Sequence, residues 1–314
     1  MKVLVTGGLG FIGSHVVDRL IKKGIETVIV DNVSGASGLT YMNPAAVLYK
    51  YDIRDETLHE VFSLEKPNAV IHLAAQIDVR ESQRNPLFDA NVNIVGTLNV
   101  LRMCEIHQVQ KLVYASSAAV YGNPEYLSID EQHPINPESC YGLSKSVPES
   151  YIRMFASLHG LKYTILRLAN VYGPRQSSHG EAGVVSVFLD RIKQGKDLVI
   201  YGDGEQTRDF VYVEDVAQAF VDAVQTDGRV NNETMNISCG IPTSINTMVR
   251  MLGDITGRDF LTTYADPRPG DILHSYLNNQ KAQELLSWFP NHNFHTGLEK
   301  TITDRLSVGS AVDH

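Results

Sequence analysis

The sequence predicts an α/β protein in which a doubly wound parallel sheet carries a smaller, interleaved C-terminal lobe. Short apolar runs of strand length alternate with segments of helical periodicity through the first half of the 314 residues. A glycine-rich turn joins the first of these strands to the first helix. Because parallel strands need a crossover between them, repeated strand–helix–strand units indicate one sheet with helices on both faces.

The expected elements follow one another closely up to residue 168. Strands are expected at Val3–Val5, Thr27–Val30, Val47–Tyr51, Ala69–His72, Lys111–Ala115 and Tyr163–Leu168. Helices are expected at Phe11–Lys23, Leu87–His107 and Ser144–Leu158. In the first helix the apolar residues stand at positions 12, 16, 17, 20 and 21, which is the spacing of a single buried face.

After Asn170 the alternation gives way to longer loops with glycine and proline, at 172–183, 201–204 and 266–270. We expect Val213–Val224 and Met235–Ile237 to return to the sheet as a helix and a strand. The predicted division is therefore a sheet domain over residues 1–170, joined by 211–240, and a smaller lobe over residues 171–314.

The composition argues against several classes of protein. A formal net charge of −9 and a pI near 5.6 disfavour nucleic-acid binding, which normally needs a basic face. No apolar run reaches about 18 residues, so no membrane span is expected. The chain opens in a strand and shows no signal peptide, which predicts a cytoplasmic protein.

The three cysteines and eleven histidines predict no metal site. Cys104, Cys140 and Cys239 lie far apart and form no CxxC pair, as expected for reduced thiols. His292 and His295 are the closest histidine pair, but no acidic residue or cysteine stands at ligand spacing from them. We therefore expect both at the surface.

A dinucleotide site is predicted where the first strand meets the first helix. In TGGLGFIG, Gly7 permits a tight turn, Gly10 admits a pyrophosphate to the backbone, and Gly13 allows the helix to pack closely. Asp31 ends the second strand, where a carboxylate accepts hydrogen bonds from ribose hydroxyls and repels a 2′-phosphate. The pattern favours NAD over NADP. The alternative is a glycine-rich turn without a ligand.

Further contacts are expected along the same edge of the sheet. Asp52 and Ile53 follow the third strand, where they can hold the adenine amino group and pack its ring, although this dipeptide is also an ordinary strand end. Small residues close the fourth strand in HLAA, as a sheet edge under a cofactor requires. His72 in this motif is interpreted as a packed core residue rather than a catalyst.

A catalytic pair is predicted in YGLSK. Tyr141 and Lys145 stand four residues apart, on one face of the expected helix. A lysine in that place stabilises a phenolate, so the tyrosine can exchange a proton with a sugar hydroxyl. The strand that ends in YASS brings the hydroxyl of Ser117 to the carboxyl edge of the sheet, where ligands bind in this architecture. Because a YxxxK match alone arises often by chance, the prediction depends on all three signals together.

Five motifs occur in order along the chain: TGGLGFIG, HLAA, YASSAAVYG, YGLSK and RDFVYVEDV. They resemble the extended short-chain dehydrogenase/reductase family, and most closely its nucleotide-sugar epimerases, particularly the UDP-glucose (UDP-galactose) 4-epimerases. The resemblance covers nearly the whole chain. It implies Ser117, Tyr141 and Lys145 as the catalytic residues. One departure is Pro148 inside the catalytic helix, where a proline normally removes a hydrogen bond.

The resemblance also implies which part of the chain binds each ligand. The Rossmann domain binds NAD through Gly7, Gly10, Phe11, Ile12, Gly13, Asp31, Asn32, Asp52, Ile53, Leu73, Ala74, Ala75, Asn93, Ser116, Tyr141 and Lys145. A UDP-sugar is bound between Ser117 and Asn170 of the sheet domain and Tyr201, Arg208, Arg268, Asp271 and Ser275 of the C-terminal part. The two arginines would clamp the diphosphate, because guanidinium forks match phosphate oxygens.

The residues after Ser117 bear on which reaction follows oxidation of the sugar at C4. Related dehydratases and decarboxylases usually carry an acid or base there, whereas this chain has Ala118 and Ala119, whose methyl groups transfer no protons. The sequence thus predicts C4 epimerisation through a 4-keto sugar. The alternatives are another sugar-nucleotide enzyme, such as a UDP-glucuronate epimerase or a decarboxylase, and a catalytically silent NAD-binding module.

Two further hypotheses follow from the resemblance. Family members restricted to glucose and galactose carry a tyrosine seven residues after the clamp arginine, and counting from Arg268 gives Ser275. A small side chain there predicts that N-acetylated sugars are also accepted, although Tyr276 is adjacent. The apolar faces of the helices at 87–107 and 144–158 predict a homodimer, as the family forms, while core packing explains them equally well.

Overall fold

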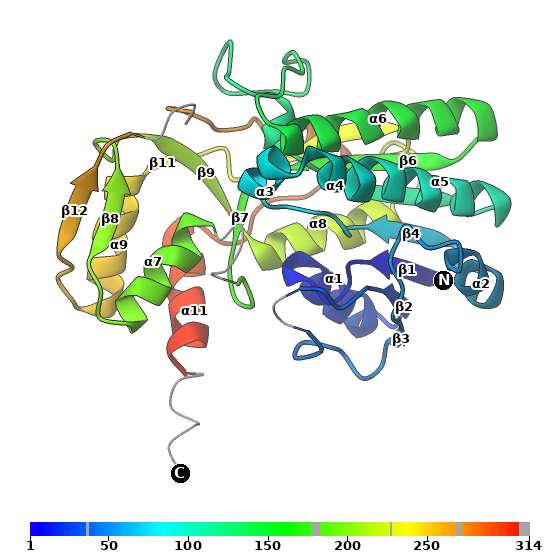
Figure 1. Cartoon of the computed structure of the whole chain (residues 1–314), viewed down its shortest axis with the longest axis horizontal. Helices are drawn as coiled ribbons and strands as arrows, with labels where there is room; N and C mark the ends of the chain where they lie inside the picture. Colours follow the sequence, from blue (N-terminus) through cyan, green and yellow to red (C-terminus); the bar gives the residue numbers. More distant parts are fainter. Residues whose placement is uncertain (36–37, 178–182, 227, 268–271, 308–314) are drawn as a thin grey trace.

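The structure is a computed structural model that describes residues 1–35, 38–177, 183–226, 228–267 and 272–307. Figure 1 shows a sheet domain with long helices on one side of the molecule and a smaller lobe with short strands on the other. The chain passes from the first part to the second near β7 and crosses back at α8, so the two parts are interleaved in sequence.

The larger sheet has seven parallel strands in the order β10-β6-β5-β4-β1-β2-β3. They are β1 (Lys2–Thr6), β2 (Glu26–Val30), β3 (Val47–Tyr49), β4 (Ala69–His72), β5 (Lys111–Ser117), β6 (Lys162–Leu168) and β10 (Glu233–Ile237). The chain begins at β1, builds outward through β2 and β3, and then returns to the other side of β1. Ligands bind at such a reversal of strand order, so the predicted doubly wound fold is confirmed and its switch point lies between β1 and β4.

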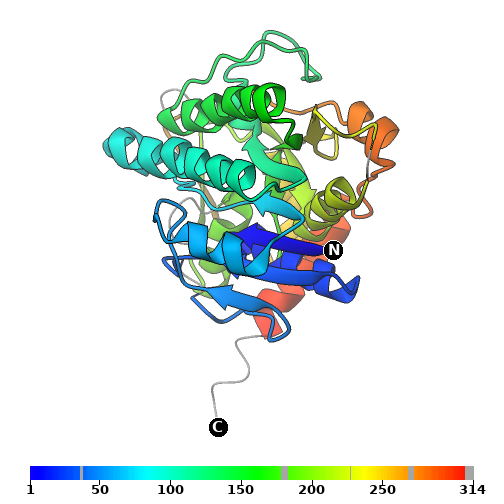
Figure 2. The same cartoon turned by 90° about the vertical axis from the view of Figure 1, so that its right-hand side faces the viewer.

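Helices cover both faces of this sheet. Helices α1 (Phe11–Lys22) and α8 (Val213–Gln225) pack on one face, and α2 (Leu58–Glu65), α5 (Gly96–Ile106) and α6 (Cys140–His159) pack on the other. Figures 1 and 2 show α5 and α6 side by side on the second face. Along β1 the fully buried Val3 and Val5 belong to the first layer and Leu4 to the second, because successive side chains of a strand point to opposite faces.

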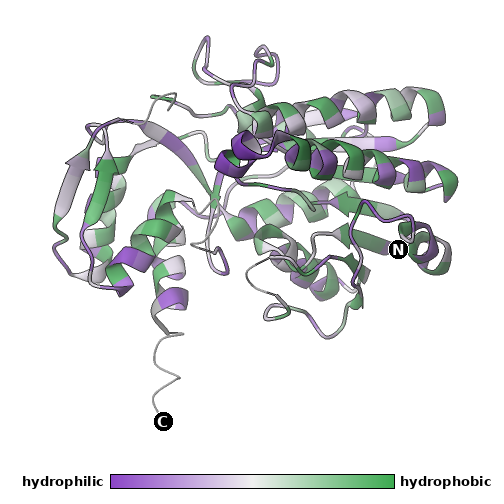
Figure 3. Ribbon diagram, in the orientation of Figure 1, coloured by the Kyte–Doolittle hydropathy of each residue, from purple (hydrophilic) through white to green (hydrophobic). Residues whose placement is uncertain are grey.

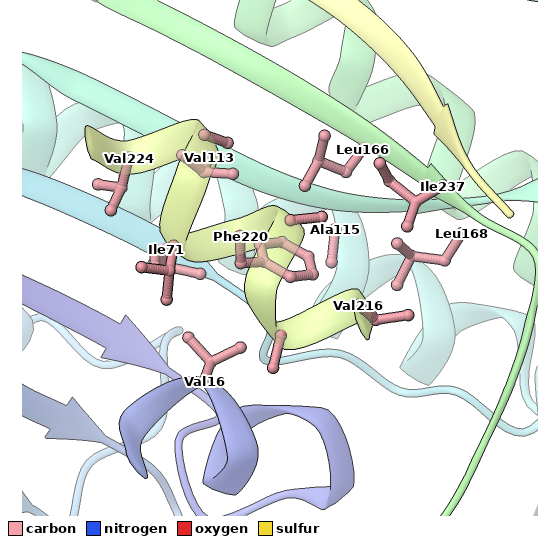
Figure 4. Close-up of a cluster of buried hydrophobic side chains, with 14 of the residues drawn as sticks. Val16, Ile71, Val113, Ala115, Leu166, Leu168, Val216, Phe220, Val224 and Ile237 are labelled. Carbon is pink, nitrogen blue, oxygen red and sulfur yellow. The ribbon is translucent and has the colours of Figure 1, made fainter. Parts of the chain in front are cut away.

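The core between α8 and the sheet is built around Phe220. Figure 4 shows its ring among Ile71, Val113, Leu166 and Val216, and all of these residues are fully buried. Figure 3 shows a related pattern, with hydrophobic strands β1 and β4 and with hydrophobic and hydrophilic residues interspersed along the long helices. The burial of each such side chain stabilises the folded state by roughly 1.5–3 kcal/mol, and this burial fixes α8 and the 211–240 segment against the sheet.

The long helix expected at 87–107 is confirmed as one continuous helical segment over residues 86–106, although part of it is not α-helical. It consists of α4 (Pro86–Ala90), the π-helix η1 (Asn91–Val95) and α5, and a separate short helix, α3 (Val79–Arg84), precedes it. The break between α3 and α4 has a local cause: Asn85 caps α4 by accepting from the backbone N–H of Phe88, and Pro86 occupies the first turn, where its missing N–H costs nothing.

The predicted catalytic helix starts four residues earlier than expected. Ser139 caps α6 by accepting from the N–H of Gly142, and Gly160 ends the helix in the left-handed conformation with φ of 73°. Pro148 lies inside the helix, and the helix continues through it. The doubt that this proline raised about the helix therefore does not apply to its Tyr–Lys turn.

The smaller lobe has two sheets of its own. One contains β7 (Asn170–Tyr172), β9 (Thr207–Tyr212) and β11 (Pro242–Ser244), and the other pairs β8 (Leu198–Tyr201) with β12 (Thr262–Ala265). Helices α7 (Val184–Lys193), α9 (Ile245–Thr256) and α11 (Phe294–Ser307) enclose a core that includes Phe188, Phe210, Met248 and Leu298. The short helix α10 (Gln280–Leu286) lies back against β10 and α8, which ties the lobe to the sheet domain.

Candidate active site

The glycine-rich turn is as tight as the sequence predicted. Gly7 has a φ of 69°, and a Cβ added to it would lie 2.7 Å from the backbone nitrogen of Ala74. A Cβ on Gly13 would lie 2.0 Å from the carbonyl oxygen of Gly7. Gly10 precedes α1 and has no side chain to cap it, so the first-turn N–H groups have no N-cap side chain as acceptor. Phe11 and Ile12 form the exit of this turn. The turn can hold an anion against its backbone.

Asp31 lies beside this turn at the end of β2. Its two carboxylate oxygens accept from the backbone N–H groups of Leu9 (3.0 Å) and Val33 (2.8 Å), which fixes the carboxylate under the turn. Asn32 donates to Asp52 at 2.9 Å. The Arg54 guanidinium beside Asp52 lowers the pKa of that carboxyl to about 2, so it is ionised at neutral pH.

Thr6 ties the ends of β1 and β4 together. Its hydroxyl lies 2.6 Å from Nδ1 of His72 and 3.2 Å from the N–H groups of Leu73 and Ala74. The other ring nitrogen of His72 lies 2.9 Å from Oγ1 of Thr97. Burial and the nearby Lys145 lower the pKa of His72 to about 3, so the ring is neutral. His72 is thus a packed core residue, as its sequence context indicated, and Ala75 follows in the loop beyond it.

Asn93 connects the loop after β4 to helix α6. It lies in the π-helix and is 2% exposed. Its side-chain amide donates to the carbonyl of Gln76, to Asp89 and to the hydroxyl of Ser144, while its oxygen accepts from the N–H of Gln76. The side chain therefore fixes where α6 lies relative to the loop that carries Leu73–Ala75.

The first turn of α6 lies directly against the end of β5. A Cβ on Gly142 would come within 2.5 Å of the carbonyl oxygen of Ala119, so only glycine permits this approach. The backbone N–H of Tyr141 donates to Ser82 of α3 at 3.0 Å. Ser117 ends β5, where its hydroxyl accepts from Ala119 N–H at 3.2 Å. The structure thus brings the predicted tyrosine and serine to one corner of the sheet.

Lys145 is buried one turn further along α6. It is 4% exposed, and its Nζ lies 4.7 Å from the ring centroid of Tyr114, which is the distance of a cation–π contact. Burial lowers the pKa of Lys145 to about 8, while the carboxylates of Glu149 and Asp89 act in the opposite direction. The ammonium is therefore mostly charged at neutral pH but close to titration. A perturbed group of this kind at a sheet edge is typical of a functional site.

The side chain of Ser116 has a structural role, because it hydrogen-bonds to a buried ion pair that sequence reasoning missed. The hydroxyl of Ser116 donates to Glu149 at 2.7 Å inside the protein, so a cofactor contact at Ser116 would use its backbone. Glu149 in turn pairs with Arg167 of β6, and both are buried. Sequence reasoning missed this pair because polar residues on a helix and a strand are usually exposed; the signal was a glutamate four residues after Lys145.

The predicted substrate residues lie in and beside the smaller lobe. Asn170 begins β7 and donates to the carbonyl of Asp209 at 3.2 Å. Arg208 on β9 donates to the carbonyls of Thr207 (2.9 Å) and Leu273 (3.5 Å). The backbone N–H of Ser275 donates to the carbonyl of Thr207 at 3.2 Å, which places Ser275 beside the strand that carries Arg208. Arg268 and Asp271 lie outside the described residues.

A cleft of about 690 Å³ opens at the end of the lobe where β8 and β12 meet. Tyr201, Gly202 and Asp203 of the predicted base-binding loop at 201–204 line it, and the lining also includes residues that sequence reasoning did not single out: Gln206, Tyr264, Pro267, Ile272 and Leu273. None of these residues belongs to the predicted catalytic trio. Two aromatic rings and several hydrogen-bonding groups suit a flat heterocyclic base at this end of the lobe.

The thiols and histidines form no second site among the described residues. Cys104, Cys140 and Cys239 are free thiols, and nowhere in the described ranges do three metal-ligating side chains gather. The expectation that His292 lies at the surface is wrong, because its ring is partly buried and lies 3.1 Å from the carboxylate of Asp215. Asp215 belongs to α8, so this contact fixes the C-terminal segment to the core. His295 is exposed. No described helix is both long enough and apolar enough to cross a bilayer.

These features define a dinucleotide-binding α/β protein with a Tyr–Lys pair at the switch point of its sheet. The model of the NAD-dependent epimerase/dehydratase family matches residues 3–238. The chain belongs to this family.

Similar proteins agree over nearly the full length. A putative UDP-glucose 4-epimerase of Methanocaldococcus jannaschii is 44% identical, with 96% of this chain and 97% of the relative covered. The structure of a UDP-glucose 4-epimerase from Thermotoga maritima with UDP-glucose has a TM-score of 0.94 at 42% identity and covers 98% and 99% of the two chains. A UDP-N-acetylglucosamine 4-epimerase from Methanobrevibacter ruminantium, in complex with UDP-N-acetylmuramic acid, has a TM-score of 0.92 at 34% identity and covers 98% of each chain.

Proposed function

We propose that the protein catalyses NAD-dependent C4 epimerisation of a UDP-sugar, of the UDP-glucose/UDP-galactose type. The observation that carries this proposal is the close packing of the Tyr141 turn on the strand end that carries Ser117, with the buried Lys145 one turn away. In the proposed division of labour, residues 1–170 and 211–240 bind NAD, and the lobe within 171–314 binds the nucleotide sugar.

The proposed NAD site fits the residues that surround it. The cradle formed by Gly7, Gly10 and Gly13 has no room for added side chains at its first and third positions and leaves its backbone open to a pyrophosphate. The Asp31 carboxylate lies beside the turn, where it would accept hydrogen bonds from the hydroxyls of a ribose and repel a 2′-phosphate. This favours NAD over NADP. Asp52 is ionised and therefore accepts hydrogen bonds, as contact with an adenine amino group requires.

The chemistry assigned to the chain itself is proton transfer and positioning. NAD, when bound, supplies the hydride acceptor for C4 and the donor that returns the hydride to the opposite face. Tyr141 would take the proton from the C4 hydroxyl and later give it back, as a general base and acid. Lys145 would hold the phenolate form by its positive charge, and Ser117 would hydrogen-bond the same hydroxyl. Arg208 would anchor the diphosphate while the 4-keto sugar turns over.

The residues after Ser117 favour epimerisation over the related reactions. Ala118 and Ala119 begin a short 3-10 turn against α6 and present only methyl groups. Dehydration or decarboxylation would need a proton donor or acceptor beside the sugar, and this pair supplies neither. The runner-up functions, a UDP-glucuronate epimerase or decarboxylase and a catalytically silent NAD-binding module, are separated from this proposal by their products.

Turnover of UDP-galactose tests the proposal. The purified protein is expected to convert it to UDP-glucose without net formation of NADH. Tyr141→Phe should lower kcat by about 10²–10⁴-fold, because the proton acceptor is lost. Tyr151→Phe, which removes the hydroxyl of an exposed tyrosine on the same helix, is the matched control and should leave kcat unchanged. Accumulation of a 4-keto-6-deoxy sugar, or full activity of the Tyr141 variant, would overturn the assignment.

We also propose that UDP-GlcNAc and UDP-GalNAc are substrates. Ser275 lies beside the strand that carries Arg208, and its small side chain would leave more space for a C2 substituent than a tyrosine. Ser275→Tyr should reduce kcat/KM for the acetamido sugars by at least about tenfold, which is about 1.4 kcal/mol of lost transition-state binding, and spare UDP-galactose. The conservative Ser275→Ala is the control and should affect neither. Equal losses on both sugar types in the tyrosine variant would contradict the hypothesis.

The proposed assembly is a homodimer acting in the cytoplasm, where both ligands are at hand. Helix α6 exposes Tyr151, Met154 and Leu158, whose spacing places them on one helical face. Val95 and Ile106 are exposed on the neighbouring η1–α5 segment. An apolar face on two adjacent helices is what a symmetric four-helix interface requires. No nucleic-acid partner is proposed, in keeping with the net charge of −9.

A further inference from the structure

A buried ion pair lies beneath the catalytic helix. Glu149 of α6 is 2% exposed and Arg167 of β6 is 3% exposed. The guanidinium donates to both carboxylate oxygens, with Nε–Oε1 at 2.9 Å and Nη2–Oε2 at 2.7 Å. This forked geometry is the strongest type of ion pair, and the hydroxyl of Ser116 adds a third hydrogen bond to the carboxylate at 2.7 Å.

The pair belongs to a chain of hydrogen bonds that reaches across the sheet. Nη1 of Arg167 donates to the hydroxyl of Tyr121 at 2.9 Å, and that hydroxyl donates to Asn236 of β10 at 2.7 Å. Tyr121 and Asn236 are fully buried. The chain therefore connects α6 with β5, β6 and β10, and it holds Glu149 in one place with little freedom to move.

The position of Glu149 matters because Lys145 lies one helical turn before it. Residues four apart on a helix lie on the same face, about 5–6 Å apart at Cβ, so the carboxylate is next to Lys145. Isolated buried charges are costly, and removing one partner of a buried pair is strongly destabilising. A helix could be held to the sheet by apolar packing alone, so the fixed negative charge at this place calls for a function.

We propose that Glu149 is a positioning residue for the reaction, which holds a negative charge beside the Lys145 ammonium and so keeps that ammonium protonated within a buried site. Arg167 and Ser116 fix the carboxylate and keep it ionised. The proposal rests on the proposed function, because it acts through the pairing of Lys145 with Tyr141.

The charges around Lys145 agree with this role. Burial alone lowers the pKa of Lys145, and the Glu149 carboxylate is the larger of the two groups that oppose this, Asp89 of α4 being the other. The pairing with Arg167 and the hydrogen bond from Ser116 lower the pKa of Glu149 against the effect of burial. The titratable and charged groups that face this pair are His72 of β4, Tyr114 of β5, Tyr141 and Arg153 of α6, Asp89 of α4 and Arg167 of β6.

The test is the pH profile of Glu149→Gln. Lys145 is charged below its pKa, so loss of the negative charge lowers that pKa and moves the alkaline limb of kcat/KM toward lower pH. A unit charge at about 6 Å in a medium of effective dielectric about 20 corresponds to a shift on the order of one to two pH units. Arg167→Gln combined with Glu149→Gln removes both charges, which avoids an unpaired buried arginine, and should shift the limb in the same direction but less.

A second readout does not depend on the loaded enzyme. Trace labelling of lysines with acetic anhydride across pH, followed by mass spectrometry, reports the pKa of Lys145 in protein without added cofactor; it should be lower in Glu149→Gln. Glu105→Gln, which removes a partly exposed carboxylate paired with His159 of α6, is the matched control and should change neither profile.

The outcomes separate the two proposals. If Lys145→Met keeps full activity, the proposed function is wrong. If Lys145→Met is inactive but both Glu149 variants lose only stability or kcat, with the alkaline limb and the labelling profile of Lys145 unchanged, then the ion pair is structural and the inference falls. A shift of both profiles toward lower pH supports it.

Discussion

Gly13→Ala tests whether the geometry of the glycine-rich turn is required for NAD binding. A Cβ at this position would lie 2.0 Å from the carbonyl oxygen of Gly7, whereas ordinary contacts begin at about 3.4 Å. The turn or the start of α1 must therefore separate by more than about 1 Å. Neither can move freely, because Gly7 is itself packed on Ala74 and hydrogen-bonded to Val30.

The size of the effect follows from this crowding. Inserting a methyl group into a well-packed site costs about 1–3 kcal/mol. Because the backbone that must move is the proposed seat of the pyrophosphate, most of this cost should appear in cofactor binding. Since about 1.4 kcal/mol corresponds to tenfold in affinity, the Kd for NAD should rise by roughly 10–100-fold.

Isothermal titration of cofactor-free protein with NAD measures this change. Gly24→Ala is the control: Gly24 follows the other end of α1 with a φ of 72°, and a Cβ there meets nothing within 4 Å. That variant should lose about 1–2 kcal/mol of stability from backbone strain and bind NAD as the parent does. If Gly13→Ala binds NAD within twofold of the parent, the turn is not the pyrophosphate site.

Two further predictions concern pH and assembly. Burial raises the pKa of Asp209 to about 6, above the unfolded value of about 3.9, so the native state holds this proton more tightly. The contribution of Asp209 to the free energy of unfolding is therefore present below about pH 4 and is lost as pH rises through 6, by on the order of 2–3 kcal/mol. Denaturant titrations from pH 4 to 7 should show this fall in the free energy of unfolding in the parent protein and not in Asp209→Asn. An equal fall in both proteins would refute the prediction. The double variant Met154→Asp/Leu158→Asp should be monomeric in sedimentation velocity, because it places charges on the exposed apolar face of α6. The control Leu64→Asp, at an exposed position on α2, should remain dimeric. If the double variant also remains dimeric, the interface lies elsewhere.

The sheet domain could be predicted because its determinants are local. The buried strand Ala69–His72 is a continuous apolar run, and its four residues are as predicted. The lobe was not predictable in the same way. Strands β8 and β12 pair across more than 60 residues of sequence, and Tyr201 and Tyr264 reach one cleft only because of that pairing. Periodicity within a segment contains no information about which distant segment lies beside it.

The burial of polar side chains could not be predicted for the same reason, because it depends on partners that are distant in the sequence. Arg167 stands between two leucines near the end of β6, and composition alone predicts that an arginine is exposed. Its burial is tolerable because Glu149 of helix α6 pairs with it, and that partner is not apparent from the strand itself. His292 was assigned to the surface for the same reason, since the Asp215 that holds it is 77 residues away in sequence.

The helical segment before α5 contains one feature that periodicity did not predict. The helix itself is present as expected, but residues 91–95 form a π-helix, whose wider turn changes the direction in which side chains leave the backbone. Asn93 lies in this turn and reaches both Gln76 in the loop after β4 and Ser144 in the Tyr–Lys turn. Asn93 thus links the proposed cofactor loop to the predicted catalytic helix from within the π-turn. The local departure from a regular α-helix therefore lies where the chain makes this link, and periodicity alone could not locate it.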